Sequence, residues 1–271
     1  MNVCIRRWSL EVFAAACALL LAWTDPSLAQ SKIYSTGFEP PTFRAGDFLL
    51  GTDGWSLAIP DFLNPAAAVI TDTVKKSGKQ SVEVWGGDLV SAPLDPDTGM
   101  PIIAPYDAAG SYRHPVNYSV TPEKPIVVVE ADLFLDTEEL ETDGDFFSLS
   151  IAVRDGDGGS LGEMALSSAG TADVYGSNAT SDSPNPFSTS AEMNKWHHLS
   201  LVMDYSGETT IVAYLLDGEV IYVDNQTEST SKTLKRGSMV VYAHPDGDGN
   251  ERANYTARFD NFRISVHGAD E

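Results

Sequence analysis

The hydrophobic residues of this 271-residue chain occur mainly in short runs that are rich in Val, Ile, Tyr, Phe and Thr. Clusters of Gly, Pro, Asn and Asp separate the runs, and helical spacing of apolar residues is nearly absent. Because no helix is expected between the runs, the pattern predicts antiparallel sheets, not βαβ units. The expected strands are Ile33–Glu39, Ala67–Val74, Ser81–Trp85, Ile126–Asp136, Phe146–Arg154, Gly162–Leu166, Trp196–Tyr205, Thr209–Leu216, Glu219–Val223, Ser238–Ala243 and Ala257–Val266.

Two segments are not expected to form strands. Ser91–Lys124 contains six prolines, and Ser167–Asn194 is rich in Ser, Thr, Asn and Gly. A long stretch without secondary structure inside a compact domain is uncommon and is often a functional loop. The first segment is the stronger functional candidate, because it carries aromatic residues and a guanidinium at Tyr112, Arg113 and His114.

Two adjacent histidines, His197 and His198, begin the most strand-like stretch of the chain. Side chains alternate across a strand, so the two imidazoles point to opposite faces and cannot hold one metal ion. We expect them at the rim and at the edge of the core. Farther along, Thr209–Leu216 is apolar on both faces, which predicts a central strand, and Asp217-Gly218 predicts a two-residue hairpin turn.

This region also carries a resemblance to a known family. The laminin-G-like domains of the concanavalin A-like lectin/glucanase superfamily have a strand pair that is similar to WHHLSLVMDYSGETTIVAYLLDGEVI. Secreted bacterial jelly-roll modules are similar in the order of the flanking pieces GFEP, GWS, SGKQSVEV and FDNFRIS. The resemblance implies an all-β sandwich of two antiparallel sheets, one of them concave, and often a structural calcium ion. It implies no particular activity, because this fold carries lectins, binding modules, hydrolases and lyases.

The first residues have the features of a secretory signal peptide. Arg6 and Arg7 precede an apolar run, Val12–Trp23, that is too short to span a bilayer, and small residues follow for cleavage. We expect a signal peptide at 1–29 and one jelly-roll domain at 30–271. The mature protein should then be secreted or periplasmic, without membrane association; a membrane anchor is the alternative.

The cysteines and the charge narrow the choice of partner. Both cysteines, Cys4 and Cys17, lie inside the expected signal peptide, so the mature domain should have no disulfide. The chain has 17 basic and 39 acidic residues, which gives a net charge of −22. Such a surface repels nucleic acid and anionic glycans, and it attracts divalent cations. The charge favours a neutral polysaccharide or oligosaccharide as partner, although solubility or a salty environment would explain it equally well.

One expected strand, VVVEADLFLD, offers a candidate pair of catalytic carboxylates. Glu130 and Asp132 share one face and lie about 7 Å apart from the rise of a strand, which is within the range that glycosidases use. A glycoside hydrolase acting through these residues on the concave face is thus an alternative function. In laminarinase-type glycoside hydrolases the corresponding strand ends in an acid/base Glu, where this chain has Phe134 and Leu135. This difference favours binding over catalysis.

The expected function is therefore that of a secreted lectin-like module that binds a neutral glycan non-covalently. An extracellular structural or adhesive module without a glycan is a further alternative. Jelly-roll modules commonly stack sugar rings on aromatic faces. The expected glycan contacts are Trp85, Tyr112, Arg113 and His114, with Arg113 as the hydrogen-bond donor and core packing as the alternative role of Trp85.

The resemblance also implies a structural calcium ion between the two chain ends. Glu39 lies in the first strand, in GFEP, and Asp260 lies in the last strand, in FDNFRIS. These strands commonly pair in the superfamily, and calcium accepts six to eight oxygen ligands in flexible geometry. In the alternatives, Glu39 is a surface carboxylate and Asp260 hydrogen-bonds a turn, or the ion lies at Asp246-Gly247-Asp248.

Overall fold

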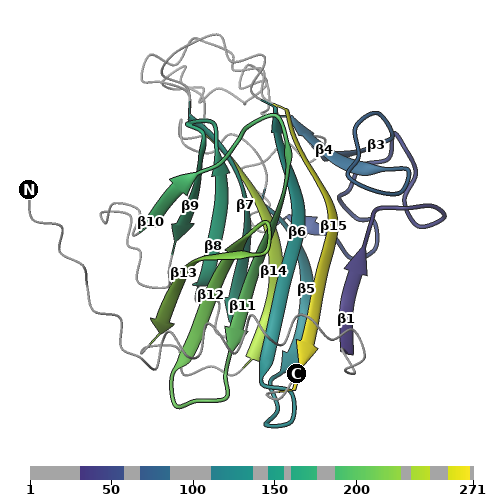
Figure 1. Ribbon diagram of the computed structural model, residues 1–271. Helices are drawn as coiled ribbons and strands as arrows, with labels where there is room; N and C mark the ends of the chain where they lie inside the picture. Colours follow the sequence, from purple (N-terminus) through teal and green to yellow (C-terminus); the bar gives the residue numbers. More distant parts are fainter. Residues whose placement is uncertain are drawn as a thin grey trace, which may run out of the picture.

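The computed structural model of the chain consists of two antiparallel sheets packed against each other (Figure 1). It describes residues 31–57, 68–85, 111–136, 146–155, 160–175, 187–226, 233–244 and 256–268. These residues form strands and turns without a helix, so the predicted all-β sandwich is confirmed. The predicted signal peptide lies outside the described residues. Within the described ranges, no helix has the length and apolar character needed to cross a membrane.

The described strands divide into an eight-stranded and a seven-stranded sheet. The eight-stranded sheet has the order β13-β12-β11-β6-β15-β4-β3, with β1 paired to β15, and the seven-stranded sheet has the order β10-β9-β8-β7-β14-β5-β2. The bounds are β1 Ser31–Thr36, β2 Ser56–Leu57, β3 Ala68–Thr71, β4 Ser81–Trp85, β5 Ser111–Ser119, β6 Ile126–Asp136, β7 Phe146–Asp155, β8 Ser160–Ser167, β9 Thr171–Tyr175, β10 Phe187–Ser190, β11 Trp196–Asp204, β12 Thr210–Leu216, β13 Glu219–Gln226, β14 Thr233–His244 and β15 Thr256–His267.

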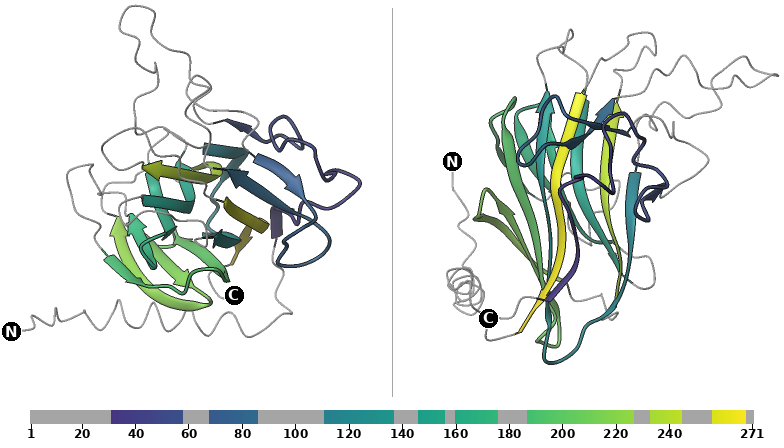
Figure 2. Two further views of the ribbon diagram at one scale, coloured as in Figure 1. Left: turned by 90° about the horizontal axis from the view of Figure 1, so that it is seen from above. Right: turned by 90° about the vertical axis from the view of Figure 1, so that its right-hand side faces the viewer.

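The hydrophobic core lies between the two sheets, which Figure 2 shows as two layers. Alternate residues of each strand point into this core, because side chains of a strand alternate between its two sides. We call the opposite side of each sheet, which points away from the core, its outer face. Core residues of the central strands include Val127, Val129, Ala131 and Leu133 on β6, Leu199 and Leu201 on β11, and Leu149, Ile151 and Val153 on β7.

Three local expectations from the sequence are confirmed. The first and last strands pair, since β1 lies beside β15. Asp217 and Gly218 have φ angles of 52° and 84°, the positive values that a two-residue hairpin between β12 and β13 requires. His197 and His198 point to opposite sides of β11: His197 is buried, and His198 lies on the outer face opposite Asp132.

Three expectations about elements are wrong. Residues Ser111–Ser119 form β5 inside the first expected loop, and the exposed Pro115 lies at a register shift, where a missing N–H is tolerated. The second expected loop also contains strands, namely β9, Thr171–Tyr175, and β10, Phe187–Ser190. The strand predicted to be central, β12, lies next to the edge strand β13, and its apolar outer residues join a small cluster on the outer face.

Candidate functional site

Polar and aromatic side chains gather on the outer face of the eight-stranded sheet, along β6 and its two neighbours. Residues directly opposite each other on adjacent strands form a rung of the sheet, and three consecutive rungs carry these side chains. From one end they are Trp196–Phe134–Arg258, His198–Asp132–Asp260 and Ser200–Glu130–Arg263, on β11, β6 and β15 respectively.

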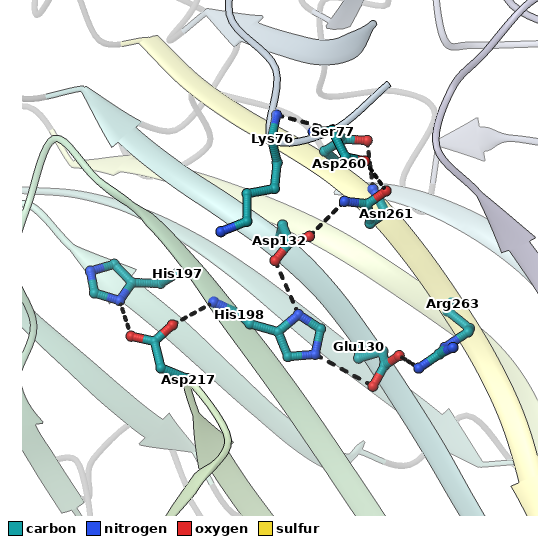
Figure 3. Close-up of polar contacts among 10 residues, drawn as sticks. All are labelled: Lys76, Ser77, Glu130, Asp132, His197, His198, Asp217, Asp260, Asn261 and Arg263. Atoms are coloured by element: carbon teal, nitrogen blue, oxygen red, sulfur yellow. Dashed lines mark hydrogen bonds and ion pairs between the residues drawn. The ribbon is translucent and has the colours of Figure 1, made fainter. Parts of the chain in front are cut away.

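His198 lies between the two carboxylates that the sequence singled out (Figure 3). Its Nδ1 is 3.1 Å from Asp132 Oδ1, and its Nε2 is 3.5 Å from Glu130 Oε2. Arg263 forms an ion pair with the other oxygen of Glu130 from the opposite strand. Glu130 therefore lies between His198 and Arg263, and Asp132 lies beside His198, although the two carboxylate side chains are only 3% and 9% exposed.

Asn261 completes this group by means of a bulge in β15. The pairing of β15 with β6 shifts its register between Asp260 and Arg263, and Asn261 has a φ of 52°. A bulge re-aims a side chain locally, and here the Asn261 amide donates a hydrogen bond of 2.7 Å to Asp132 Oδ2. The same residue donates its backbone N–H to Asp260 Oδ1 at 2.7 Å.

The neighbours decide the protonation of this group. Burial raises the pKa values of Glu130 and Asp132, but hydrogen bonds and opposite charges outweigh it, and both pKa values end below their ordinary range. The hydrogen bond of His198 with Asp132 and its longer 3.5 Å ion-pair contact with Glu130 raise the pKa of His198 to about 9. Near neutral pH the site thus holds two carboxylates and an imidazolium. A glycosidase acid is a carboxyl group with a raised pKa, whereas the pKa values of both carboxyl groups here are lowered.

An aromatic pair occupies the first rung. The rings of Phe134 and Trp196 lie 5.5 Å apart between centroids, and both residues are partly exposed. The Arg258 guanidinium lies 5.6 Å from the centre of the Phe134 ring. Glu83 at 2.8 Å and Asp136 at 3.2 Å hold this guanidinium in place. The rung therefore presents an apolar ring surface directly beside fixed charged groups.

The structure does not bring the four expected glycan contacts together. Tyr112 is 0% exposed and packs in the core, so its ring is not open to a sugar. His114 stacks on Tyr34 with ring centroids 3.6 Å apart, and Arg113 donates to Ser56 Oγ at 3.2 Å. These three residues belong to β5 of the seven-stranded sheet. The side chain of Trp85, at the end of β4 in the other sheet, lies outside the described residues.

Glu39 and Asp260, the expected calcium ligands, both face the turn between β3 and β4. Glu39 Oε1 accepts the N–H groups of Lys79 at 2.6 Å and Gln80 at 3.1 Å. Asp260 Oδ2 accepts the N–H groups of Lys76 and Ser77, each at 3.1 Å. Because N–H donors point at Glu39 Oε1 and at both oxygens of Asp260, this pair of carboxylates does not fit a cation.

A metal site can be assessed only among the described residues. Within the described ranges, no three His, Cys, Asp or Glu side chains are grouped so that they could hold an ion. Asp246-Gly247-Asp248, the other candidate place for calcium, lies outside those ranges. Burial raises the pKa of Asp260 to about 6, although three backbone N–H groups lower it. Calcium therefore stays a prediction, without a ligand set among these residues.

Sequence reasoning found Glu130 and Asp132 but missed their partners His198, Arg263 and Asn261. The alternation of β11 did place Trp196 and His198 on one face, which was a usable signal. What the sequence lacked was the register that sets these residues opposite β6. The bulge at Asn261 had no sequence signal that we used.

No protein-family model and no curated protein sequence matches the chain, but solved structures resemble it. An endo-1,3-beta-glucanase from Streptomyces sioyaensis has a TM-score of 0.59 at 11% identity, over 90% of this chain and 98% of that chain. A carbohydrate esterase from the Shiga toxin-encoding bacteriophage phi24B has a TM-score of 0.55 at 12% identity, over 89% and 100%. The carbohydrate recognition domain of Emp46p has a TM-score of 0.49 at 11% identity, over 88% and 98%. At these identities the likeness to the first two structures establishes the fold alone, which is the concanavalin A-like jelly roll.

Proposed function

From the concanavalin A-like jelly-roll fold and the chemistry of one outer face, we propose that this chain is an exported, lectin-like module that binds a neutral glycan without cleaving it. The observation that carries the proposal is the partly exposed Trp196–Phe134 pair beside the fixed guanidinium of Arg258. A sugar ring places its apolar C–H surface on aromatic rings and its hydroxyl groups on neighbouring polar side chains. This rung offers both.

Two further observations support a neutral ligand. The net charge is −22, and the carboxylates of the site are held ionised. An acidic sugar would therefore be repelled at long range by the net charge and at short range by the carboxylates. Two neighbours in fold, a glucanase and a carbohydrate esterase, are named for action on carbohydrates. Their likeness is in fold, and the glycan is proposed here from the side chains of the outer face.

Binding is favoured over hydrolysis because the candidate carboxylates lack a proton to donate. A glycosidase pair needs one carboxylic acid with a raised pKa beside an ionised partner. Glu130 and Asp132 both have lowered pKa values, because His198 lies beside both carboxylates and Arg263 pairs with Glu130. We therefore expect no release of reducing ends from any glycan that binds.

The test is a titration of the mature domain with neutral 1,3- and 1,4-linked β-glucan oligosaccharides and with an alginate oligosaccharide of the same length. We expect a neutral oligosaccharide to bind, alginate to bind more weakly, and Trp196→Ala to weaken binding roughly tenfold, the scale of ring stacking. Phe48→Ala is the matched control, because Phe48 is an aromatic residue that is 53% exposed in an unrelated region. Trp196→Phe should keep most of the affinity.

Three results would count against this function. Equal binding by wild type and Trp196→Ala would remove the site from this face. Release of reducing ends would favour the hydrolase alternative, and no retention of any glycan would favour the structural or adhesive alternative. N-terminal sequencing tests the proposed export. The exported protein should begin near Gln30, and recovery of Met1 would contradict cleavage of a signal peptide.

A further inference from the structure

Three buried polar atoms without a hydrogen-bond partner lie on one rung of the outer face. They are Ser200 Oγ on β11, Glu130 Oε2 on β6 and Arg263 Nε on β15. The register sets Ser200 and Arg263 directly opposite Glu130 on its two sides. Ser200 and Glu130 are only 1% and 2% exposed, and the ion-pair contact of Glu130 Oε2 with His198 Nε2 is long, at 3.5 Å.

Such a group of atoms is unusual in a folded protein. A buried donor or acceptor loses its hydrogen bonds to water, and if no new hydrogen bond replaces them the folded state is destabilised. Most buried polar atoms therefore have a partner. Three on adjacent strands, all on the same side of the sheet, indicate a partner from outside the chain. The place lies next to the proposed glycan site and not in the core.

The three atoms differ in what they can accept or donate. Arg263 Nε only donates, Glu130 Oε2 as a carboxylate oxygen only accepts, and Ser200 Oγ does both. A hydroxyl group matches the first two at once, because its oxygen accepts from Nε–H while its hydrogen goes to Oε2. A second hydroxyl on the adjacent carbon can then bond with Ser200.

We propose that the rung Ser200–Glu130–Arg263 is a subsite for two adjacent hydroxyl groups of an unsubstituted neutral sugar. This inference rests on the proposed function and names the chemistry that the site selects. A uronic acid is rejected here, because its carboxylate would face the carboxylate of Glu130. The three atoms are buried, so the ligand reaches them only when the side chains of His198 and Arg263, which are 32% and 40% exposed, move aside.

The spacing also sets a minimum length for the glycan. Ser200 follows Trp196 by four residues on the same strand, which corresponds to about 13 Å. That distance is longer than one sugar ring, so one ring cannot stack on Trp196 and reach Ser200. The affinity should therefore increase from a monosaccharide to an oligosaccharide of the same linkage.

The experiment measures both stability and affinity of Ser200→Ala. Since Ser200 Oγ has no partner in the free protein, its removal should leave the melting temperature unchanged or higher. The affinity for the neutral β-glucan oligosaccharide should fall about fivefold, the value of one lost hydrogen bond. Arg263→Lys keeps a positive charge beside Glu130 but removes Nε–H, and it should lose affinity to a similar extent.

Ser265→Ala is the matched control. Ser265 is a serine on the same face that is 0% exposed, but its hydroxyl is hydrogen-bonded with His267 Nε2 at 3.1 Å. This variant should lose some stability and keep its affinity. A permethylated form of the same oligosaccharide has no hydroxyl group to donate. Its affinity for wild type should be no higher than the affinity of the native oligosaccharide for Ser200→Ala.

The outcomes separate this inference from the proposed function. If Trp196→Ala weakens binding and Ser200→Ala does not, the glycan site stands and the subsite is overturned, because the three atoms then hold water only. If Ser200→Ala lowers the melting temperature as much as Ser265→Ala does, its oxygen has a partner within the protein and the subsite is also overturned. If wild type binds no glycan, both proposals fail.

Discussion

The outer faces of the two sheets carry carboxyl groups whose pKa values are shifted in opposite directions. On the eight-stranded sheet, Arg263 and His198 hold Glu130 as an anion, and its pKa is lowered despite burial. On the seven-stranded sheet, Glu163 accepts a hydrogen bond of 2.6 Å from the Ser150 hydroxyl. Burial raises the pKa of Glu163, and neither that bond nor the charge of Arg154 offsets it.

The difference comes from what the neighbouring strands place beside each carboxyl group. Opposite Glu130, β11 and β15 supply hydroxyl and guanidinium groups, with an imidazole one rung away. Opposite Glu163 lie Ala152 and Tyr175, and the buried outer residues around it are mostly small. The pKa values of two glutamates in similar strands are therefore shifted in opposite directions because of their cross-strand partners, and their own sequence surroundings do not show this difference.

Removing the cation from the first face should have the largest effect. Arg263→Ala leaves the buried Glu130 with only the longer ion pair to His198, so we expect a loss of about 2 kcal/mol in the free energy of unfolding. Urea denaturation measures this loss. The control is Lys195→Ala: Lys195 pairs with Glu192 at 3.1 Å on an exposed surface, and such pairs contribute about 0.5 kcal/mol or less. Equal losses in the two variants would show that the Glu130 pair is no stronger than a surface pair.

The contributions of Glu130 and Glu163 to stability should change with pH in opposite directions. Glu130 has a lowered folded pKa, so its contribution is present above its ordinary pKa of 4.5 and is lost as the pH falls through the folded pKa. Glu163 has a raised folded pKa, so its contribution is present below 4.5 and is lost as the pH rises through the folded pKa. The stability lost by Glu130→Gln should therefore grow with pH, while Glu163→Gln should gain stability relative to wild type.

Thermal unfolding of wild type and both variants between pH 2 and pH 8 measures the two slopes, because the Glu130 contribution changes below 4.5 and the Glu163 contribution changes above it. Each Gln variant keeps the shape of the side chain and removes its titration, so it serves as the reference for its own face. Slopes of the same sign would mean that the two pKa values are shifted in the same direction. The comparison between the faces would then be wrong.

The sequence predicted the fold better than the site. The fold follows from local alternation along each strand, whereas the site depends on pairing between strands that are far apart in the chain. Alternation along β6 and β11 is local, and it correctly placed Glu130, Asp132 and His198 on given faces. Pairing of β6 with β15 is not local, because these strands are far apart in the chain and a bulge at Asn261 sets their register. Tyr112 shows the opposite error: a Pro-rich setting suggested a loop, but the residue lies in a buried strand position.

Glu39 and Asp260 add a third kind of partner to the comparison, since neither a cationic side chain nor a hydroxyl group satisfies them. Backbone N–H groups of the turn from Lys76 to Gln80 do so instead. Gly78 permits this approach, because a Cβ at that position would collide with the Glu39 carboxylate. Both acidic residues therefore act, in this geometry, as anchors that fix the turn between β3 and β4.

The smallest expected effect concerns calcium at this place. Because the oxygens of Glu39 and Asp260 already accept N–H groups, we expect a chelator to leave the melting temperature of wild type unchanged. The resemblance to the superfamily makes the opposite prediction, because an ion that binds only the folded state adds about 2.7 kcal/mol at a hundredfold excess over its dissociation constant. Asp260→Ala should lower the melting temperature equally with calcium and with chelator, since it loses three hydrogen bonds either way. A calcium-dependent shift in wild type that disappears in Asp260→Ala would place an ion at Asp260 and overturn the assignment of these residues as turn anchors.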